Sequence, residues 1–343
     1  MDTRIPLRGW PQNLKSGYAY PSQLANLDGT WNHDQNRFSA KSELTSIKTL
    51  CGYHMPETSI ITIANQKGGV GKTTTVVNLA QAYASMGKRV CVIDVDYQAN
   101  ATALLGGTEI AKAGKTLTHA LDQELHLDDV VEKTKFENIS LVAADRQLDS
   151  LREKLNDQPH RTTLFNFFLN SKETRKFDVI IFDTHPSLDC YLQSALAASH
   201  YYLIPLFAEP DSTSGLAHQI SAVEKVRRHL NPMLMFLGCV ITRYEKTNAT
   251  HVKFQKYIRD LSLQSNFNVF ETTIPVSQSV TAASAHSLPL AVYKKNLPVA
   301  MAYATLAGEI LPYLKGKRKG RQHTPADIQL IEKHTSFELS PDL

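Results

Sequence analysis

The stretch Lys67-Gly68-Gly69-Val70-Gly71-Lys72-Thr73-Thr74 decides the fold of this 343-residue chain. It directly follows an apolar, β-branched run, Ile60 to Ala64, which predicts a buried strand, and it precedes a segment with helical apolar periodicity, Thr73 to Met86. A glycine turn between a strand and a helix N-terminus aims several backbone N–H groups at one point, and such a cradle binds phosphate. The sequence therefore predicts a nucleotide-binding loop.

The residues of this loop divide the work of holding a nucleoside triphosphate. We expect the glycines to allow close approach of the backbone, Lys72 to neutralise the β and γ phosphates, and the Thr73 hydroxyl to ligate Mg²⁺. No guanine-specific NKxD signature occurs late in the chain, which favours adenine. The predicted cofactors are ATP and Mg²⁺, and the predicted cofactor-binding residues of the loop are Lys67, Gly68, Gly69, Val70, Gly71, Lys72, Thr73 and Thr74.

Two aspartates end other predicted strands. Asp94 closes the run Val90 to Asp94, and Asp183 closes the run Val179 to Asp183. Because the carboxyl ends of parallel strands line the ligand crevice, we expect both carboxylates beside the phosphates. Asp94 can orient a water for in-line attack or hold the water shell of the metal, and the sequence leaves both roles open. Asp183 has the Walker B arrangement, which supports Mg²⁺ through water.

The rest of the chain alternates strand-length apolar runs with helix-length amphipathic segments. This alternation is typical of an α/β fold with a doubly wound, mostly parallel sheet and helices on both faces. The further predicted strands are Ile139 to Ala143, Tyr201 to Leu206 and Phe236 to Thr242, and the further helices are Asp145 to Asn156, Thr162 to Asn170, Cys190 to Ser199, Ser214 to His229, Ala249 to Leu263 and Val299 to Leu314.

Composition predicts three parts. Residues 1–57 are rich in Pro, Gly, Asn and Asp and are expected to form an irregular arm, residues 58–314 an ATPase domain, and residues 315–343 a tail that begins with the basic run KGKRKGR. Four distant cysteines favour neither a zinc site nor disulfides. No run of about 18 apolar residues and no apolar stretch after Met1 is present, so we expect a cytoplasmic protein.

Three motifs together resemble the ParA/MinD group of deviant Walker A ATPases, over roughly residues 59–314. They are the glycine loop, Asp94-Val95-Asp96-Tyr97-Gln98, and Asp183-Thr184-His185-Pro186-Ser187. Within the group the chain is most similar to ParA, since Gln98-Ala99-Asn100-Ala101-Thr102 follows its switch I pattern. The resemblance implies a deviant P-loop NTPase that hydrolyses ATP, forms an ATP-dependent homodimer, binds DNA non-specifically on the nucleoid, and partitions plasmid or chromosomal DNA with a ParB-like centromere-binding adaptor.

The resemblance also implies roles for single residues. Lys67 would reach across the dimer to the phosphates of the other subunit, which adds it to Lys72 and Asp94 as a catalytic candidate. The adenine base would lie between Arg243 and the loop after Pro275. Two residues depart from the family pattern, because Tyr97 and His185 stand where prolines are usual in the two switch loops. We expect these loops to be altered.

One predicted helix carries a candidate DNA surface. In the segment 249–263, Phe254, Tyr257, Ile258 and Leu261 share one side, and the basic residues Lys253, Lys256 and Arg259 lie on the other. A basic helix face is usually only solvated, but Lys294 and Lys295 add positive charge in the same third of the chain. This combination suits sequence-independent contact with phosphates.

Three other functions compete with partition. A MinD-like membrane-associated positioning ATPase would need a terminal amphipathic helix, and the basic tail lacks an apolar face. An electron-transfer ATPase like the nitrogenase iron protein would need cysteines near the switch loops, where none occurs. An ATP-dependent ligase of small molecules shares the same loop and stays open.

Overall fold

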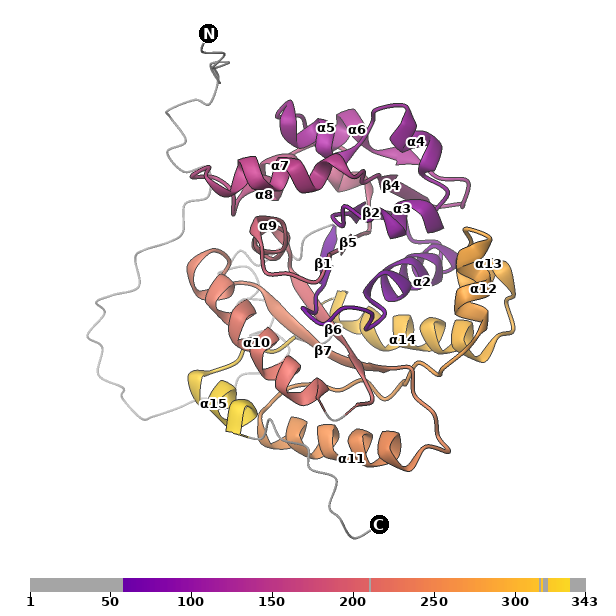
Figure 1. Ribbon diagram of the computed structural model, residues 1–343, viewed down its shortest axis with the longest axis vertical. Helices are drawn as coiled ribbons and strands as arrows, with labels where there is room; N and C mark the ends of the chain where they lie inside the picture. The colour runs from indigo at the N-terminus through magenta and orange to yellow at the C-terminus, as the bar shows by residue number, and fades with distance from the viewer. Residues whose placement is uncertain (1–57, 210, 315, 317–319, 334–343) are drawn as a thin grey trace, which may run out of the picture. The chain divides into compact units, whose positions relative to one another are not determined.

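A seven-stranded sheet forms the centre of the molecule (Figure 1). The computed structural model describes residues 58–209, 211–314, 316 and 320–333; the expected arm over residues 1–57 lies outside them. The strand order is β3-β4-β2-β5-β1-β6-β7, and every pair is parallel except β3 with β4. The strands are β1 Ser59–Ile63, β2 Val90–Asp94, β3 Glu132–Lys133, β4 Ile139–Val142, β5 Val179–Asp183, β6 Tyr201–Phe207 and β7 Met235–Thr242.

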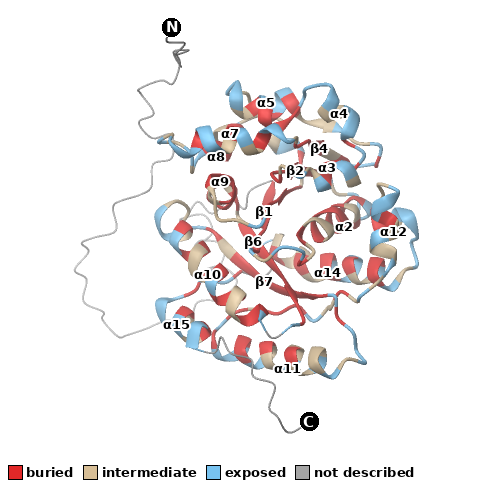
Figure 2. Cartoon of the chain, viewed as in Figure 1, coloured by how far each residue is buried: buried red, intermediate tan, exposed pale blue. Residues whose placement is uncertain are grey.

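Both faces of the sheet are buried. Side chains alternate between faces along a strand, so Ile61 and Ile63 of β1 enter one apolar cluster and Ile60 enters another. The same alternation places Cys91 and Ile93 of β2 opposite Val90 and Val92. This explains why the strands are continuous apolar runs: each residue meets a helix layer (Figure 2).

Helices cover the two faces. One face packs against α2 and α14, and the other against α7, α8, α9, α10 and α11 (Figure 1). None of the helices in the described ranges combines the length and hydropathy that a bilayer span requires. The longer helices are α2 Lys72–Ser85, α7 Gln147–Asn156, α9 Cys190–Ala198, α10 Ser212–His229, α11 Ala249–Gln264, α14 Pro298–Leu314 and α15 Pro325–Lys333; the shorter ones are α3 Asn100–Leu104, α4 Thr108–Lys112, α5 Leu117–Asp122, α6 Leu127–Val130, α8 Leu164–Phe168, α12 Ser279–Ala285, α13 Leu290–Tyr293 and the 3₁₀ turn η1 Thr174–Lys176.

The predicted α/β class and doubly wound parallel sheet are confirmed. All six predicted strands and all seven predicted helices are present, with ends that differ by up to two residues. The short antiparallel strand β3 was not predicted.

The C-terminal segment departs from the expected tail. The backbone of Arg321 exchanges two hydrogen bonds with Phe236 at the edge strand β7, with N···O distances of 2.7 and 2.8 Å. Ile328 and Ile331 of α15 are buried in the same cluster as α10. The described residues 320–333 therefore pack on the domain, and we propose that the ATPase domain extends to Lys333.

Candidate nucleotide site

The glycine loop joins β1 to α2 and has the backbone that phosphate binding needs. Gly69 has φ of 72° and Gly71 has φ of 85°, a region that disfavours side chains, and Gly71 is the N-cap of α2. Gly68 has no such constraint. The first N–H groups of a helix have no partner within it, so α2 offers donors and a positive dipole end at this loop.

Three side chains from outside the loop hold it in place. Asn65 accepts a hydrogen bond from the Lys67 N–H at 2.9 Å. Gln219 of α10 accepts one from the Gln66 N–H at 3.0 Å, and the Thr242 hydroxyl donates to the Val70 carbonyl at 3.1 Å. These anchors could not be predicted from the sequence, because Gln219 and Thr242 lie more than 150 residues along the chain from the loop.

Lys72 is buried at the base of the loop. Its Nζ donates to the Lys67 carbonyl at 3.3 Å. Burial lowers the pKa of Lys72, while the nearby Asp183 and Asp96 carboxylates raise it in part. Lys67 is the one hydrogen-bond partner of this buried ammonium in the part of the chain that the structure describes, so an anion would stabilise it and Lys72 suits its predicted role toward phosphates.

Lys67 lies half-buried at the mouth of the site. Its Nζ is 2.8 Å from Asp211 and 3.1 Å from Glu209, and it lies 5.7 Å from the centre of the Phe207 ring. Burial lowers the pKa of Lys67, but the hydrogen bonds to Asp211 and Glu209 raise it overall. Two carboxylates of the same chain therefore hold this lysine.

Asp94 and Asp183 are paired residues of adjacent parallel strands, β2 and β5, so their carboxyl groups meet at one sheet edge. Asp94 is fully buried. One of its oxygens accepts from the Thr102 N–H (2.8 Å) and hydroxyl (2.7 Å), and the other accepts from the Asp96 N–H (3.2 Å). Burial raises the pKa of Asp94 to about 7. These bonds attach the start of α3 to the sheet.

Asp183 has the opposite surroundings. It is fully buried, and neither carboxylate oxygen has a hydrogen-bond partner in the described residues. Burial raises the pKa of Asp183 well above its usual range, and the neighbouring Asp94 adds to the rise. The Thr73 hydroxyl offsets part of the rise without completing a hydrogen bond. Unpaired buried oxygens beside a hydroxyl suit a hydrated cation.

No group of three His, Cys, Asp or Glu side chains that could hold a metal alone occurs in the described part of the chain. A magnesium ion usually keeps several waters and takes one or two protein oxygens together with the phosphates of the nucleotide. Thr73 and Asp183 match that donor set.

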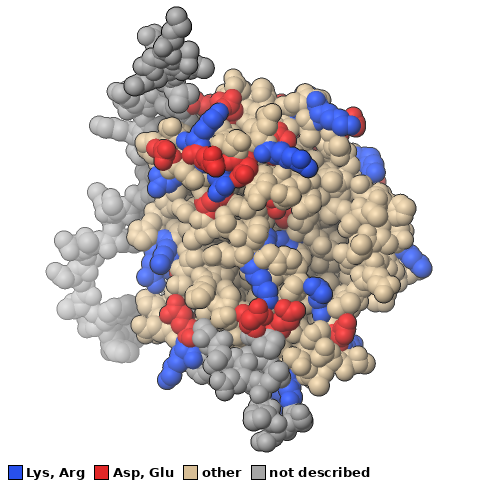
Figure 3. Space-filling view, viewed as in Figure 1, with Lys and Arg blue, Asp and Glu red and all other residues tan. Residues whose placement is uncertain are grey.

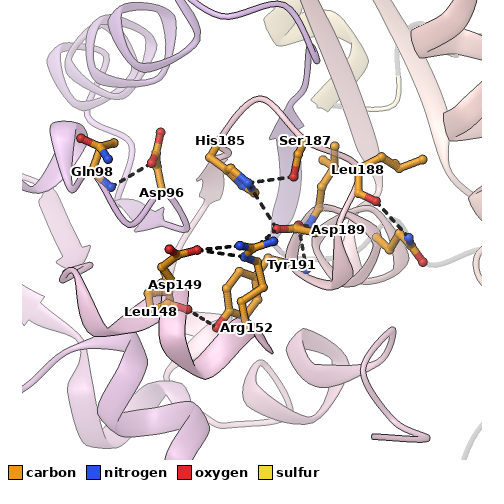
Figure 4. A network of polar contacts seen from close by, with 12 residues as sticks. Asp96, Gln98, Leu148, Asp149, Arg152, His185, Ser187, Leu188, Asp189 and Tyr191 are labelled. Atoms are coloured by element: carbon orange, nitrogen blue, oxygen red, sulfur yellow. Dashed lines mark hydrogen bonds and ion pairs between the residues drawn. The ribbon is translucent and has the colours of Figure 1, made fainter. Parts of the chain in front are cut away.

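Asp96 is a functional candidate that the sequence analysis did not select. It is 8% exposed, and one of its oxygens accepts from the Gln98 N–H at 2.9 Å (Figure 4). It lies close enough to Lys72 and Asp183 to affect their pKa values. Its position two residues after Asp94, past the end of the buried strand, is the signal that could have identified it.

The two segments expected to hold the base lie together. Tyr244 pairs with Pro275: the Tyr244 N–H donates to the Ile274 carbonyl at 2.9 Å, and the Tyr244 carbonyl accepts from the Val276 N–H at 3.2 Å. Arg243 is exposed, has φ of 52°, and places its guanidinium 4.7 Å from the centre of the Phe207 ring. Phe207 also contacts Lys67, so these segments adjoin the phosphate loop.

The candidate DNA-binding residues differ in whether their side chains already form contacts within the fold. Arg259 of α11 pairs with Glu271 at 2.6 Å and donates to the Glu271 carbonyl at 3.2 Å, so it is committed to the fold. Lys256 is exposed and Lys253 is half-buried on the same helix, and the lysines Lys294 and Lys295 are exposed after α13. On the face shown in Figure 3, basic side chains are scattered among acidic ones.

Comparisons with known proteins place these observations in a family. Residues 58–236 match the family model described as an AAA domain. The chain is 33% identical over 255 residues to the sporulation initiation inhibitor protein Soj of Bacillus subtilis, covering 73% of this chain and 97% of Soj. It is 30% identical over 253 residues to the chromosome partitioning protein ParA of Caulobacter vibrioides, covering 74% of this chain and 93% of that protein.

A solved structure shows how far the fold extends. The cobyrinic acid a,c-diamide synthase of Mycobacterium smegmatis with bound ADP and magnesium matches with a TM-score of 0.66 at 26% identity. The match covers 78% of this chain and 100% of the synthase. A synthase therefore has a similar fold, whereas the two sequence relatives above are a sporulation initiation inhibitor and a chromosome partitioning protein.

Proposed function

Because the chain belongs to the ParA family of partition ATPases, we propose that it is an ATP-dependent switch that forms a homodimer with ATP, binds DNA non-specifically, and positions plasmid or chromosomal DNA. The chain is an ATPase, and its cofactors are ATP and Mg²⁺. Its partner would be a ParB-like centromere-binding adaptor, and it would be located on the nucleoid in the cytoplasm.

The observation that carries the proposal is the arrangement of the two loop lysines. Lys72 is buried inside the site, whereas Lys67 lies at its mouth, where its Nζ pairs with Glu209 and Asp211 of its own chain. Exposed ion pairs of this kind contribute little, so a second subunit's phosphates can compete for Lys67. The position of Lys67 at the mouth of the site supports the proposal of an ATP-dependent dimer.

The catalytic roles divide among the carboxylates. When bound, Mg²⁺ would neutralise charge on the phosphates, and Thr73 and Asp183 would hold it. We assign the orientation of the attacking water to Asp96 in place of Asp94, because both oxygens of Asp94 are already occupied by hydrogen bonds. Lys72 and the N-terminus of α2 bind the phosphates.

DNA binding would use lysines that form no ion pair or hydrogen bond within the described ranges. Lys253, Lys256, Lys294 and Lys295 are the candidates, and dimerisation doubles their number. If a dimer neutralises about six phosphates, affinity falls by roughly three decades between 50 and 200 mM salt. Arg259 supports α11 in this scheme.

The test is retention of the purified full-length chain on DNA of unrelated sequences with ATP, with ADP and without nucleotide. We expect the protein to be retained on DNA only when ATP is present, and the retention to fall steeply with salt concentration. Light scattering should show that Lys67→Ala no longer forms dimers with ATP. The double variant Lys253→Ala/Lys256→Ala should lose retention, and the matched control Lys154→Ala/Lys172→Ala, with the same charge change at exposed sites elsewhere, should keep it. Retention on anionic vesicles in place of DNA would favour the membrane alternative and overturn the partition proposal.

A further inference from the structure

The two residues that replace the usual prolines touch each other. Tyr97 lies in the loop between β2 and α3, and His185 lies in the loop between β5 and α9. Their ring centres are 5.6 Å apart with an angle of 59° between the planes, a tilted aromatic contact. Because β2 and β5 are adjacent and parallel, the loops leave the same edge of the sheet side by side.

His185 is fixed from its other side. Its ring is 8% exposed, and Nε2 lies 2.8 Å from the Ser187 hydroxyl and 3.3 Å from Oδ2 of Asp189 (Figure 4). Asp189 is also the N-cap of α9, since its Oδ1 accepts from the N–H groups of Tyr191 and Leu192, both at 3.1 Å. The contact between the two loops is therefore connected to the start of α9.

The connection continues to α7. Arg152 of α7 places Nε 3.8 Å from Oδ2 of Asp189 and donates to Asp149 of its own helix at 2.7 Å. The Tyr191 hydroxyl of α9 donates to the Leu148 carbonyl of α7 at 2.8 Å. Figure 4 shows these residues in one network that leads from α7 through Asp189 to His185 and Ser187. The network gives the ring of His185 a rigid base on two helices.

A proline at either position would restrain its loop by fixing its own φ. Tyrosine and histidine impose no such local restraint, so each loop gains backbone freedom relative to the family pattern. In the described residues, neither the Tyr97 N–H nor the His185 N–H donates a backbone hydrogen bond that could restrain its loop instead. The contact between the rings restrains both loops together.

We propose that Tyr97 and His185 are positioning residues for ATP hydrolysis: their contact holds the two loops in one arrangement and replaces the two local restraints with a shared one. Tyr97 directly follows Asp96, and His185 comes two residues after Asp183. Because the two rings are in contact, a movement of one loop would also displace the other loop and the aspartate next to it. This inference deepens the proposed function, because it concerns the placement of its catalytic carboxylates.

The test is steady-state ATP turnover by the full chain carrying a double-mutant cycle. Tyr97→Ala and His185→Ala should each lower kcat by about 10-fold and change KM by less than about twofold, because misplacement of catalytic groups costs rate more than ground-state binding. The double variant should lose no more than either single variant, since both remove one shared contact. Tyr97→Phe keeps the ring and should retain wild-type kcat.

A second set of variants replaces Tyr97 and His185 by proline. Tyr97→Pro alone and His185→Pro alone break the contact and should be slow, whereas the double proline variant regains both local restraints and should exceed each single variant in kcat. Tyr293→Ala is the matched control, since Tyr293 stacks on His286 at the same 5.6 Å separation away from the site. Thermal unfolding checks that each variant folds.

Additive losses in the alanine cycle, or a kcat for Tyr97→Phe as low as that of Tyr97→Ala, would overturn the inference. A wild-type chain without turnover would instead count against the ATPase site itself. The two failures are therefore distinguishable.

Discussion

The carboxylates at the ends of β2 and β5 occupy paired positions in adjacent strands, yet their surroundings are opposite. Asp94 is buried and accepts three hydrogen bonds from Thr102 and Asp96. Asp183 is equally buried and accepts none in the described residues. Since an unpaired buried polar group costs about 1–3 kcal/mol, the fold tolerates Asp183 only at the expense of its own stability.

This difference separates support from function. A carboxylate whose oxygens are all bonded to the chain fixes backbone, and Asp94 fixes the start of α3. A carboxylate kept without partners is available to a ligand from outside. Sites that bind ligands commonly retain such locally unfavourable groups.

The largest effect is expected at Asp183. Asp183→Asn keeps the shape but removes the charge that attracts a hydrated cation, so ATP turnover should fall about 1,000-fold. The nucleotide-free variant should be more stable than wild type, because burial raises the pKa of Asp183. Because the pKa of Asp183 is higher in the folded than in the unfolded chain, the free energy of unfolding of wild type decreases as pH rises above about 4. The stability advantage of the variant therefore grows with pH.

Phosphate release and thermal unfolding without nucleotide measure the two effects. Nucleotide affinity measured without Mg²⁺ is the control and should change little. A variant that is less stable than wild type at pH 8 would contradict the assignment of Asp183 as an unpaired buried carboxylate.

Asp96→Asn should give the second largest effect, a fall in turnover of about 100-fold, because a general base or water-orienting group typically contributes 10²–10⁴-fold. ATP affinity should stay within about threefold, since Lys72 and the helix N-terminus still hold the phosphates. Single-turnover hydrolysis of pre-bound ATP separates the two quantities. Wild-type turnover in this variant would return the role to Asp94.

Asp94→Asn should reduce turnover less than about 10-fold, because Asp94 acts through the backbone that it holds. Its signature is a pH dependence. The pKa of Asp94 is raised to about 7, so its contribution to wild-type stability is present below about pH 4 and is lost as pH rises to about 7. The free energy of unfolding of the variant should therefore improve relative to wild type between pH 4 and 7. A pH-independent difference would mean that Asp94 does not titrate in this range.

Much of the fold could be predicted from the sequence. The parallel strands are buried on both faces, so each is a continuous run rich in β-branched residues. The ends of such a run predict the ends of the strand. The short helices α3 to α6, α12 and α13 span four to seven residues, which is too few for a helical period to show. The packing of residues 320–333 depends on the distant Phe236, which no local pattern reveals.

The site was predictable where chemistry lies in consecutive residues. The loop from Lys67 to Thr74 has the residue spacing of a phosphate-binding loop, and the structure places it at the junction of β1 and α2, as expected. The proposed division of roles between Asp94 and Asp96 could not be predicted, because it depends on which oxygen of Asp94 Thr102 occupies. The commitment of Arg259 to Glu271 is likewise a tertiary contact.

Thr102 offers the finest test of the comparison, because it is the residue that satisfies Asp94. Its hydroxyl donates to Asp94 at 2.7 Å and accepts from the Ala144 N–H at 2.9 Å, so it connects β2 with the segment after β4.

Thr102→Val keeps the shape and leaves a buried N–H and part of a carboxylate unpaired, which should cost about 1–2 kcal/mol of unfolding free energy. Turnover should fall only about twofold to threefold, because the Thr102 N–H still holds Asp94. Thr102→Ser, which keeps the hydroxyl, is the control and should cost less than about 1 kcal/mol. Denaturant unfolding of both variants beside phosphate release decides the matter: if Thr102→Val lowers turnover as strongly as Asp96→Asn while stability is unchanged, then Asp94 and its partner belong to the reaction itself, and the separation between a supporting and a functional carboxylate fails.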